Sequence, residues 1–419
     1  MEHGFSLRPR PRSHRLSIEI TFVRHAETDA NAGGVWQGQG GHGLSARGRA
    51  QAKALGERLG RYEFDRVIVS DLPRTMETAA LAGLDAVPDP AWREIDIGRW
   101  QGLTRDEVVE RYPEESAAWS SGEPIAMGGG ESWPGFSARV ERALDALVES
   151  TPHGSRVLVV THGGNVHAVM GNRLGFGPGA RPWPLERVRN ASITQTVVAG
   201  DRFHLQTYND ARHAGSLPDG AGTLMLVRHA ETEANRSGQW HGRTDGPLSD
   251  HGRVQAAAAA SALPPASRIL SSPLERTRTT AAAYAARLGL EVQLESDLIE
   301  IDFGTWEGLT TSEIQERFAD EWHRVFEEGR DDPRGGSGET FEAAGSRMQA
   351  VVERVAEVVG AERAALFTHG GAIWTLAGRV LGLRWPEQRL LDIPGNTSIT
   401  HVQRIDGRLR LVDYNLSAT

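Results

Sequence analysis

The segment VRHAETDAN at Val23–Asn31 recurs almost unchanged as VRHAETEAN at Val227–Asn235. The two copies begin 204 residues apart in a chain of 419 residues, and each follows an apolar run and leads into glycine-rich sequence. An Arg-His pair at the end of a strand can hold an anion on the guanidinium group and present the imidazole to it as a nucleophile. The chain is therefore a tandem duplication, and the repeat indicates where the chemistry is located in each half.

Composition narrows the class of protein before any single residue is considered. A chain of this length exceeds what one hydrophobic core usually organises, so we expect two domains. The net charge of −9 argues against a protein that binds nucleic acid or anionic membranes through a basic face. The absence of cysteine from the sequence excludes disulfides, a thiolate nucleophile and a cysteine-zinc site. No apolar run is long enough to cross a bilayer, so a cytoplasmic enzyme is predicted.

The duplication and the composition together predict four segments. Residues 1–17 are a basic leader without the apolar stretch of a secretory signal, and we expect them to be disordered. Domain 1 is predicted over residues 18–212 and domain 2 over residues 222–419. Residues 213–221 between them are rich in Gly, Pro, Ser and Asp, and this composition is typical of a linker.

The same order of elements is expected in both halves. After the first strand come a helix capped by Ser45 or Ser249 and a short β-branched strand, followed by a second helix. Later, an apolar strand at 157–160 or 364–367 ends in Thr-His-Gly-Gly, and a pair of strands closes each domain. Strands that alternate with helices predict an α/β fold of two tandem three-layer α/β/α sandwich domains, with mainly parallel sheets and one antiparallel edge. Ligands of such sheets bind beyond the carboxyl ends of the strands, where both His motifs fall.

The residues at these strand ends suit a phosphate ester. Its transferring group carries about two negative charges, so a site for it needs several fixed cationic donors. Arg24 and Arg74 are candidates, and His162 is a third donor at a helix N-terminus that adds a partial positive charge. The neutral nitrogen of His25 is a competent nucleophile. Glu94, in EIDIGRWQG, is the best-placed acid to protonate the leaving group.

Domain 2 offers the same residue types in the same order: Arg228, His229, Arg276, Glu300 and His369. The acid has alternatives, because Asp96, Glu27 or Glu131 and their counterparts could also supply a proton. Glu131 and Glu339 directly precede helices, and this position favours a role in helix-start electrostatics.

This set of residues resembles the histidine phosphatase superfamily, which has the phosphoglycerate mutase-like fold. The resemblance covers nearly the whole chain twice, through RHAETDAN and RHAETEAN, SDLPRT and SSPLERTRTTA, REIDIGRWQG and IEIDFGTWEG, and the two THGG turns. It implies hydrolysis of small phosphate monoesters through a phosphohistidine, with no metal and no cofactor. The compact domains with an E-I-D-x-G-x-W-x-G segment look like the phosphatase branch rather than the glycolytic mutases.

The resemblance also assigns roles to individual residues. It makes His25 and His229 the phosphoryl-accepting histidines, and Glu94 and Glu300 the proton donors. It implies a substrate-binding set in each domain: Arg24, Asn31, Gln37, Gly38, Arg74 and His162 in domain 1, and Arg228, Asn235, His241, Gly242, Arg276 and His369 in domain 2.

The two domains differ in the loop that follows the first motif. Family members usually read G-R-T-D-x-P-L-S there, as domain 2 does at 242–249, whereas domain 1 reads GQGGHGLS at 38–45. We therefore expect a more flexible loop and more permissive substrate contacts in domain 1, with the core chemistry retained. Arg243 adds a cation near the domain 2 pocket, unless Asp245 neutralises it, and would favour substrates with a second negative group. After THGG, domain 1 has Asn165 where domain 2 has Ala372, which predicts a more polar neighbour for the second histidine.

Three alternatives remain open at this point. The same residues could serve a phosphoglycerate-type mutase or a phosphotransferase, in which the acceptor is not water. Domain 1 could be a phosphate-binding regulatory module. A metal hydrolase is the chemical competitor, but the sequence holds no H-x-x-E-H or D-x-D cluster, and arginines beside the ligands would repel a cation. A small phosphorylated molecule is the expected partner, and the sequence names neither that molecule nor the oligomeric state.

Overall fold

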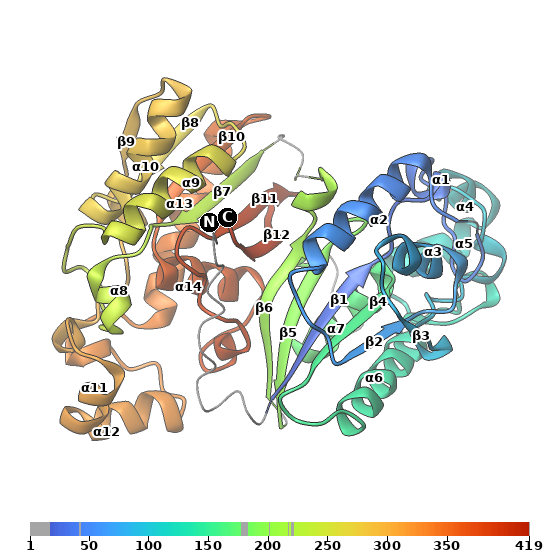
Figure 1. Ribbon diagram of the computed structural model, residues 1–419, viewed down its shortest axis with the longest axis horizontal. Helices are drawn as coiled ribbons and strands as arrows, with labels where there is room; N and C mark the ends of the chain where they lie inside the picture. Colours follow the sequence, from blue (N-terminus) through green and yellow to red (C-terminus); the bar gives the residue numbers. More distant parts are fainter. Residues whose placement is uncertain are drawn as a thin grey trace. The chain divides into compact units, whose positions relative to one another are not determined.

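The computed structural model describes residues 17–41, 43–176, 183–200, 202–216, 218 and 222–418. Residues 1–16 of the predicted leader lie outside these ranges. His42 of the domain 1 loop and part of the predicted linker also lie outside them. The chain divides into two compact units, one of residues up to Trp183 with Arg187–Leu217, the other of Pro184–Glu186 with Pro218–Thr419. Figure 1 labels the elements of both.

The first unit is built on one sheet with the strand order β3-β2-β4-β1-β5-β6. Its strands are β1 (Ile18–Arg24), β2 (Arg66–Val69), β3 (Val87–Pro88), β4 (Arg156–Thr161), β5 (Ile193–Ala199) and β6 (Arg202–Asp210). The pairs among β3, β2, β4 and β1 are parallel, whereas β5 and β6 pair antiparallel. The predicted mainly parallel sheet with one antiparallel edge is thus confirmed.

Helices cover both faces of this sheet. They are α1 (Asp29–Ala32), α2 (Ala46–Leu59), α3 (Pro73–Leu81), α4 (Arg105–Arg111), α5 (Pro113–Ser121), α6 (Trp133–Glu149) and α7 (Gly163–Arg173). Neighbouring residues of a strand point to opposite faces. Val23 packs in a cluster with Leu55 of α2 and Ala79 of α3. The ring of Phe22 instead faces Trp92, which lies in a short 3-10 turn that α6 contacts. The three predicted layers follow from this alternation.

The second unit repeats the arrangement with the strand order β12-β11-β7-β10-β8-β9. Its strands are β7 (Thr223–Arg228), β8 (Arg268–Ser271), β9 (Val292–Leu294), β10 (Arg363–Thr368), β11 (Ile399–Ile405) and β12 (Arg408–Leu416). Its helices are α8 (Glu233–Ser237), α9 (Asp250–Ala262), α10 (Glu275–Leu288), α11 (Thr311–Arg317), α12 (Ala319–Trp322), α13 (Phe341–Val359) and α14 (Gly370–Val380). A π-helical turn follows α12 at His323–Glu327. None of the helices in the described ranges is long and apolar enough to cross a membrane.

Sheet register brings the two histidine motifs of each half together. In the first sheet β1 and β4 pair in parallel with Arg24 opposite Thr161, and the amide of His25 donates to the Thr161 carbonyl oxygen at 2.8 Å. In the second sheet Arg228 lies opposite Thr368 in the same way. The residue after each strand is a histidine, so each sheet presents two imidazoles at the carboxyl ends of adjacent central strands, as the topology of such sheets favours for a ligand site.

Candidate active site

His25 is a buried imidazole with one nitrogen fixed by the backbone. Its side chain is 3% exposed, and Nδ1 lies 2.8 Å from the carbonyl oxygen of Ala26. A carbonyl oxygen only accepts, so Nδ1 carries the hydrogen and Nε2 keeps its lone pair. Burial, followed by the positive charges of Arg74 and Arg24, lowers the pKa of His25 well below its ordinary value. The ring is therefore neutral at neutral pH, as a nucleophile requires.

His162 packs edge-on against His25, with ring centroids 5.3 Å apart, at the N-terminus of α7. Its Nε2 lies 2.8 Å from the Ser70 hydroxyl, and its buried Nδ1 has no hydrogen-bond partner among the described residues. Burial is also the main reason that the pKa of His162 is well below its ordinary value. In the protein without ligand, His162 is thus a neutral hydrogen-bonding group rather than a cation.

Two arginines, the buried Arg74 and the half-buried Arg24, supply the positive charge. Arg74 is 1% exposed; its Nε donates to His25 Nε2 at 3.2 Å, and its two terminal nitrogens donate to the carbonyl oxygens of Gly38 and Gly40, each at 2.7 Å. Arg24 donates through Nη1 to the Val188 carbonyl oxygen at 2.6 Å. Burial lowers the pKa of each arginine to about 10, so both remain charged at neutral pH.

Glu94 is held at the start of α7. One carboxylate oxygen accepts from the amide of Gly164 at 3.1 Å, and the other accepts from the amide of Ile95 at 3.0 Å. Arg139 of α6 fixes the segment that carries it, donating to the carbonyl oxygens of Arg93 at 3.0 Å and Glu94 at 3.2 Å.

Glu131, one of the alternative acids, is engaged elsewhere. Its carboxylate forms a two-point ion pair with Arg139 at 2.9 and 2.8 Å and also accepts from the amide of Asp96 at 2.9 Å. Burial would raise the pKa of Glu131, but the bonds from Arg139 and Asp96 outweigh it and lower that pKa. Glu131 therefore buttresses the Glu94 segment.

Asn31 and Gln37 lie in the loop after β1. Asn31 Oδ1 accepts from the amide of Thr28 at 3.2 Å and from Asn190 Nδ2 at 3.1 Å, and Gln37 Nε2 donates to the Thr28 hydroxyl at 2.9 Å. Asn190 also donates to the carbonyl oxygen of His25 at 3.1 Å. Asn31 thus fixes the loop that carries Gln37.

A cleft of about 420 Å³ brings most of these side chains together. Seven of the eight predicted site residues of domain 1 line it: Arg24, His25, Asn31, Gln37, Gly38, Arg74 and Glu94. The eighth, His162, contacts His25. Further lining comes from residues that were not expected from the sequence, including Trp119, Met127, Arg187 and Asn190. The cleft is larger than a phosphoryl group, so it also has room for the rest of a small ester.

Domain 2 repeats this geometry. His229 Nδ1 lies 2.7 Å from the Ala230 carbonyl oxygen, and its ring lies 5.2 Å from that of His369. Burial is the main reason that the pKa values of both histidines are well below the ordinary value. The carboxylate of Glu300 accepts from the amides of Gly371 at 3.0 Å and Ala372 at 2.9 Å.

Asn235 and Arg276 of domain 2 keep most partners of Asn31 and Arg74, with a difference at the Nε of Arg276. Asn235 accepts from Asn396 Nδ2 at 3.1 Å, and Arg276 donates to the Gly242 carbonyl oxygen at 2.6 Å. However, Nε of Arg276 donates to Nδ1 of His369 at 3.3 Å, whereas Nε of Arg74 donates to Nε2 of His25.

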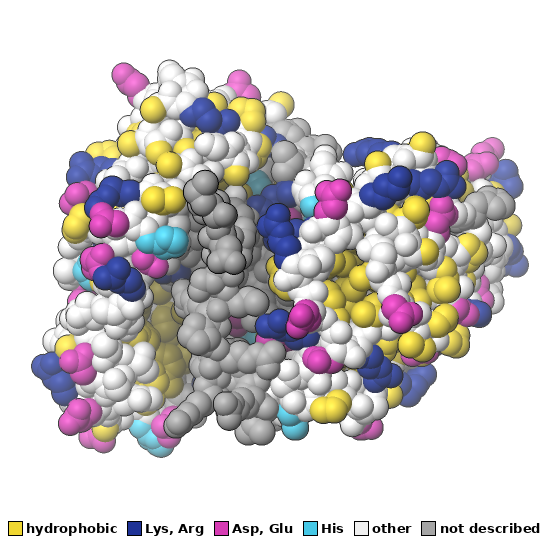
Figure 2. Space-filling model, in the orientation of Figure 1, with side chains coloured by type: hydrophobic (Ala, Val, Ile, Leu, Met, Phe, Trp, Pro, Cys, Tyr) yellow, Lys and Arg dark blue, Asp and Glu magenta, His cyan; other side chains and the backbone are white. Residues whose placement is uncertain are grey.

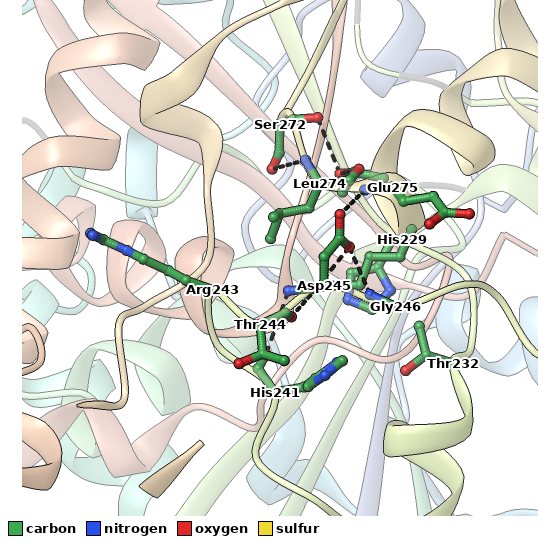
Figure 3. Close-up of polar contacts among 12 residues, drawn as sticks. His229, Thr232, His241, Arg243, Thr244, Asp245, Gly246, Ser272, Leu274 and Glu275 are labelled. Carbon is green, nitrogen blue, oxygen red and sulfur yellow. Dashed lines mark hydrogen bonds and ion pairs between the residues drawn. The ribbon is translucent and has the colours of Figure 1, made fainter. Parts of the chain in front are cut away.

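The loops that follow the first motifs are anchored by different side chains. In domain 2, Asp245 accepts from the amide of Glu275 at the start of α10 at 2.6 Å, and it pairs with Arg276 at 3.5 Å (Figure 3). Domain 1 lacks this aspartate, but Glu77 of α3 accepts from the amide of Leu44 at 2.8 Å. The anchor has moved from the loop to the helix, a compensation that the sequence comparison of the loops alone could not indicate.

His241 and Arg243 occupy opposite sides of the domain 2 loop. His241 points toward the site in Figure 3, and its buried Nδ1 has no partner within the described part of the chain. Arg243 points away from His229 and pairs with Asp302 at 3.3 Å and Glu339 at 3.5 Å. It is thus neutralised by these two carboxylates rather than by Asp245.

The sequence reasoning missed two repeated side chains that hold each site together. Asn190 and Asn396 tie the last loop of each domain to the first, and Arg139 and Arg347 hold the segments of the two glutamates. The duplication contained the signal, because both asparagines precede a shared Ser-Ile-Thr and both arginines occupy the same position after GGES or SGET. The predicted polar role of Asn165 is modest: its amide donates to the Arg93 carbonyl oxygen at 3.3 Å.

Comparison with known proteins follows the same division into halves. The sequence model of the histidine phosphatase superfamily (branch 1) matches residues 20–211 and again residues 224–417. A metal-independent phosphoserine phosphatase of Arabidopsis thaliana is 34% identical over 209 residues, covering 48% of this chain and 84% of the relative. A glucosyl-3-phosphoglycerate phosphatase of Mycobacterium tuberculosis is 36% identical over 188 residues, covering 42% of this chain and 83% of the relative. Phosphoglycerate mutase-like protein 4 of Arabidopsis thaliana is 33% identical over 216 residues, covering 49% and 91%.

Proposed function

Because the chain belongs to the histidine phosphatase superfamily in both of its halves, we propose that each half has an active site that forms a phosphohistidine, on His25 and on His229. Family membership confirms the resemblance found in the sequence, together with the class of enzyme, a hydrolase of phosphate monoesters. The roles of individual residues are our proposal, and the geometry of the two sites supports them.

Binding uses the two arginines. In domain 1 the phosphoryl oxygens are held by the half-buried Arg24 and the buried Arg74, both charged, beside the imidazole of His25. Charge-assisted hydrogen bonds are strong in such a water-poor site, and their donors are already oriented by the loop carbonyls. The carboxyl group of Glu94 lines the same cleft, where it can give a proton to the leaving oxygen.

The first chemical step transfers the phosphoryl group to the imidazole. The lone pair of His25 Nε2 attacks phosphorus, the bond from phosphorus to the ester oxygen breaks, and its electron pair leaves with that oxygen. Glu94 gives its proton to the departing alkoxide. The positive charge that develops on the ring is stabilised by the bond from Nδ1 to the Ala26 carbonyl oxygen.

The second step regenerates the enzyme. The ionised Glu94 takes a proton from a water molecule as the water oxygen attacks phosphorus. The phosphorus–nitrogen bond then breaks, its electron pair returns to Nε2, and inorganic phosphate leaves. Domain 2 follows the same course with His229 and Glu300.

The observation that carries this proposal is the state of the two nucleophilic rings. Each is buried and neutral, each has its Nδ1 bonded to a backbone carbonyl oxygen, and each lies beside charged arginines. Since domain 1 keeps every member of this set, and Glu77 replaces the loop anchor that it lacks, we propose that domain 1 turns over substrate rather than only binding it.

A mutase or phosphotransferase uses the same residues with another acceptor, and one relative is named mutase-like. The test is to incubate the protein with a panel of phosphate esters, beginning with phosphoserine, and to measure free phosphate and new phosphate esters in parallel. Stoichiometric free phosphate is expected. Formation of a rearranged ester without free phosphate would show that the protein transfers the phosphoryl group rather than hydrolysing the ester.

We further propose that the partner is a small phosphorylated molecule in the cytoplasm and that neither nucleic acid nor membrane is bound. Besides the net charge of −9, the interspersed acidic and basic side chains on the face shown in Figure 2 support this proposal. No group of three or more His, Asp or Glu within the described ranges could hold a metal ion. Metal independence remains a prediction, tested below.

A further inference from the structure

A serine hydroxyl group contacts the second histidine of each site. In domain 1, Ser70 Oγ lies 2.8 Å from Nε2 of His162. In domain 2, Ser272 Oγ lies 2.9 Å from Nε2 of His369. All four side chains are fully buried. Neither hydroxyl group takes part in the two chemical steps, although both halves of the chain have one.

The sheet of domain 1 holds Ser70 beside His162. Strand β2 ends at Val69, which lies opposite Val160 of β4. The amide of Ser70 donates to the Val160 carbonyl oxygen at 2.9 Å, and the Ser70 carbonyl oxygen accepts from the hydroxyl group of Thr75 at 2.8 Å. His162 follows two residues after Val160, so the hydroxyl group and the ring meet at the same edge of the sheet.

The other nitrogen of the His162 ring faces the place where phosphate binds. In domain 2 the matching atom, Nδ1 of His369, accepts from Nε of Arg276 at 3.3 Å, so this nitrogen is turned toward the arginine. The two pairs of histidine rings have nearly the same geometry, with interplanar angles of 61° and 63°. Nδ1 of His162 therefore faces the same way, and it has no hydrogen-bond partner among the described residues.

The balance of hydrogen bonds decides which nitrogen of His162 carries the hydrogen. Burial lowers the pKa of His162, so the ring is neutral and has one N–H group. If Nε2 carried the hydrogen, both the hydroxyl hydrogen of Ser70 and the lone pair of Nδ1 would lack a partner within the described ranges. If Nδ1 carries it, the hydroxyl group donates to Nε2, and only the Nδ1–H group is left over. The second arrangement leaves fewer buried polar groups unpaired, which costs less free energy.

Resting on the proposed function, we propose that Ser70 is a positioning residue of domain 1. Its hydroxyl group donates to Nε2 of His162 and thereby holds the ring hydrogen on Nδ1, from which His162 donates to a phosphoryl oxygen. No proton moves in this arrangement, so His162 binds phosphate as a neutral donor beside the charged Arg24 and Arg74.

Domain 2 holds the other tautomer before phosphate binds. Because Nδ1 of His369 accepts from Arg276, it carries no hydrogen. The hydrogen is on Nε2 and is donated to Ser272, since a hydroxyl oxygen accepts as well as donates. The two domains are therefore expected to differ in this ring when no phosphate is present.

NMR of the protein labelled with ¹⁵N in its histidines tests the tautomers, because long-range couplings show which ring nitrogen carries the hydrogen. The signals are assigned with His162→Gln and His369→Gln. Without phosphate, His162 should carry the hydrogen on Nδ1 and His369 on Nε2. Ser70→Ala should give a mixture of both tautomers at His162, and Ser70→Thr, which keeps the hydroxyl group, should not. A hydrogen on Nε2 of His162, or one that stays wholly on Nδ1 in Ser70→Ala, would overturn the proposal.

The matched control is Ser137→Ala. Ser137 is also buried, its hydroxyl group donates to Asn172 at 2.7 Å, and it does not line the cleft. This change should leave the His162 signals as they are. If the extra methyl group prevents Ser70→Thr from folding, Ser70→Cys replaces it, and its weaker donor should give a smaller admixture of the Nε2 tautomer than Ser70→Ala does.

Titration with inorganic phosphate, followed at the His162 signals, needs no turnover and reports domain 1 alone. Ser70→Ala should weaken phosphate binding about three- to fivefold, because only part of the rings then present the donor. In the His229→Ala protein, where only domain 1 turns over, kcat/KM should fall by a similar factor. Equal phosphate affinity in Ser70→Ala and Ser70→Thr would overturn the positioning role. If no ester is hydrolysed while phosphate affinity still depends on the hydroxyl group, the proposed hydrolysis fails and the positioning role stands.

Discussion

Arg139→Met is expected to slow domain 1 without weakening its hold on the phosphate. Arg139 is 22% exposed and donates to the carbonyl oxygens of Ala91 and Arg93, each at 3.0 Å, and of Glu94 at 3.2 Å. Met keeps most of the side-chain volume but removes these three hydrogen bonds and the two-point ion pair with Glu131. A hydrogen bond from a charged group contributes about 1.5 kcal/mol at the lower end of its range, and water can reach part of this site, so we expect a loss of about 3 kcal/mol of domain stability.

Arg139→Met should slow catalysis because it displaces the segment that carries Glu94. A displaced acid cannot reach the leaving oxygen, and proton transfer contributes roughly 100-fold or more to such reactions. In the His229→Ala protein, we expect Arg139→Met to lower kcat about 10- to 100-fold while KM changes less than about threefold, because Arg24 and Arg74 are untouched.

Steady-state kinetics and urea unfolding measure the two effects, and Arg142→Met is the control. Arg142 lies on the same helix and is exposed. The reasoning is refuted if Arg139→Met keeps kcat within twofold of the Arg142→Met protein, or if its whole loss of activity is a rise in KM.

Three further predictions follow from the same contacts. The free energy of unfolding should fall as the pH drops below about 6.5, because the lowered pKa of His25 lets the unfolded chain bind a proton that the folded chain does not. His25→Asn should remove about 1 kcal/mol of the loss between pH 6.5 and 5.5. Denaturant titrations at several pH values would refute this if the unfolding free energy of both proteins fell equally with pH. Overnight dialysis against a strong chelator should leave turnover unchanged, and activity that is lost and then restored by zinc or magnesium would overturn the phosphohistidine mechanism. Asp245→Ala should raise the KM of domain 2 alone, and Glu77→Gln the KM of domain 1 alone, because each change releases only its own loop. The His25→Ala protein reports the KM of domain 2, and the His229→Ala protein reports that of domain 1. A change that raised the KM of the other domain would contradict the assignment.

The parts of the structure that depend on local sequence could be predicted. Ser45 caps α2 and Ser249 caps α9, as expected from a serine before an amphipathic run. The repeated motifs correctly predicted that the strands follow one another in the same order in both halves. Since parallel strands end at one edge of a sheet, it also placed both histidines of each half at the same edge.

The parts that depend on contacts between distant segments could not be predicted. Asn190 reaches Asn31 across 159 positions of sequence; the duplication repeats both asparagines, but no local pattern pairs them with each other. Likewise, the correspondence between Arg187 and Ile393 follows from the structure. Arg24 donates to the residue after Arg187, and Arg228 donates to the residue after Ile393. The sequence showed that Arg243 is charged but not that its side chain points away from His229.

The central claim is that the chain forms one phosphohistidine in each half. Rapid-quench labelling with a ³²P-labelled phosphate ester, followed by alkaline denaturation to preserve an acid-labile phosphoramidate, counts these intermediates directly. Two labelled sites per chain are predicted for the wild-type protein, one for His25→Ala or His229→Ala, and none for the double variant. Label that survives in the double variant, or that appears on a residue other than these two histidines, would contradict the account.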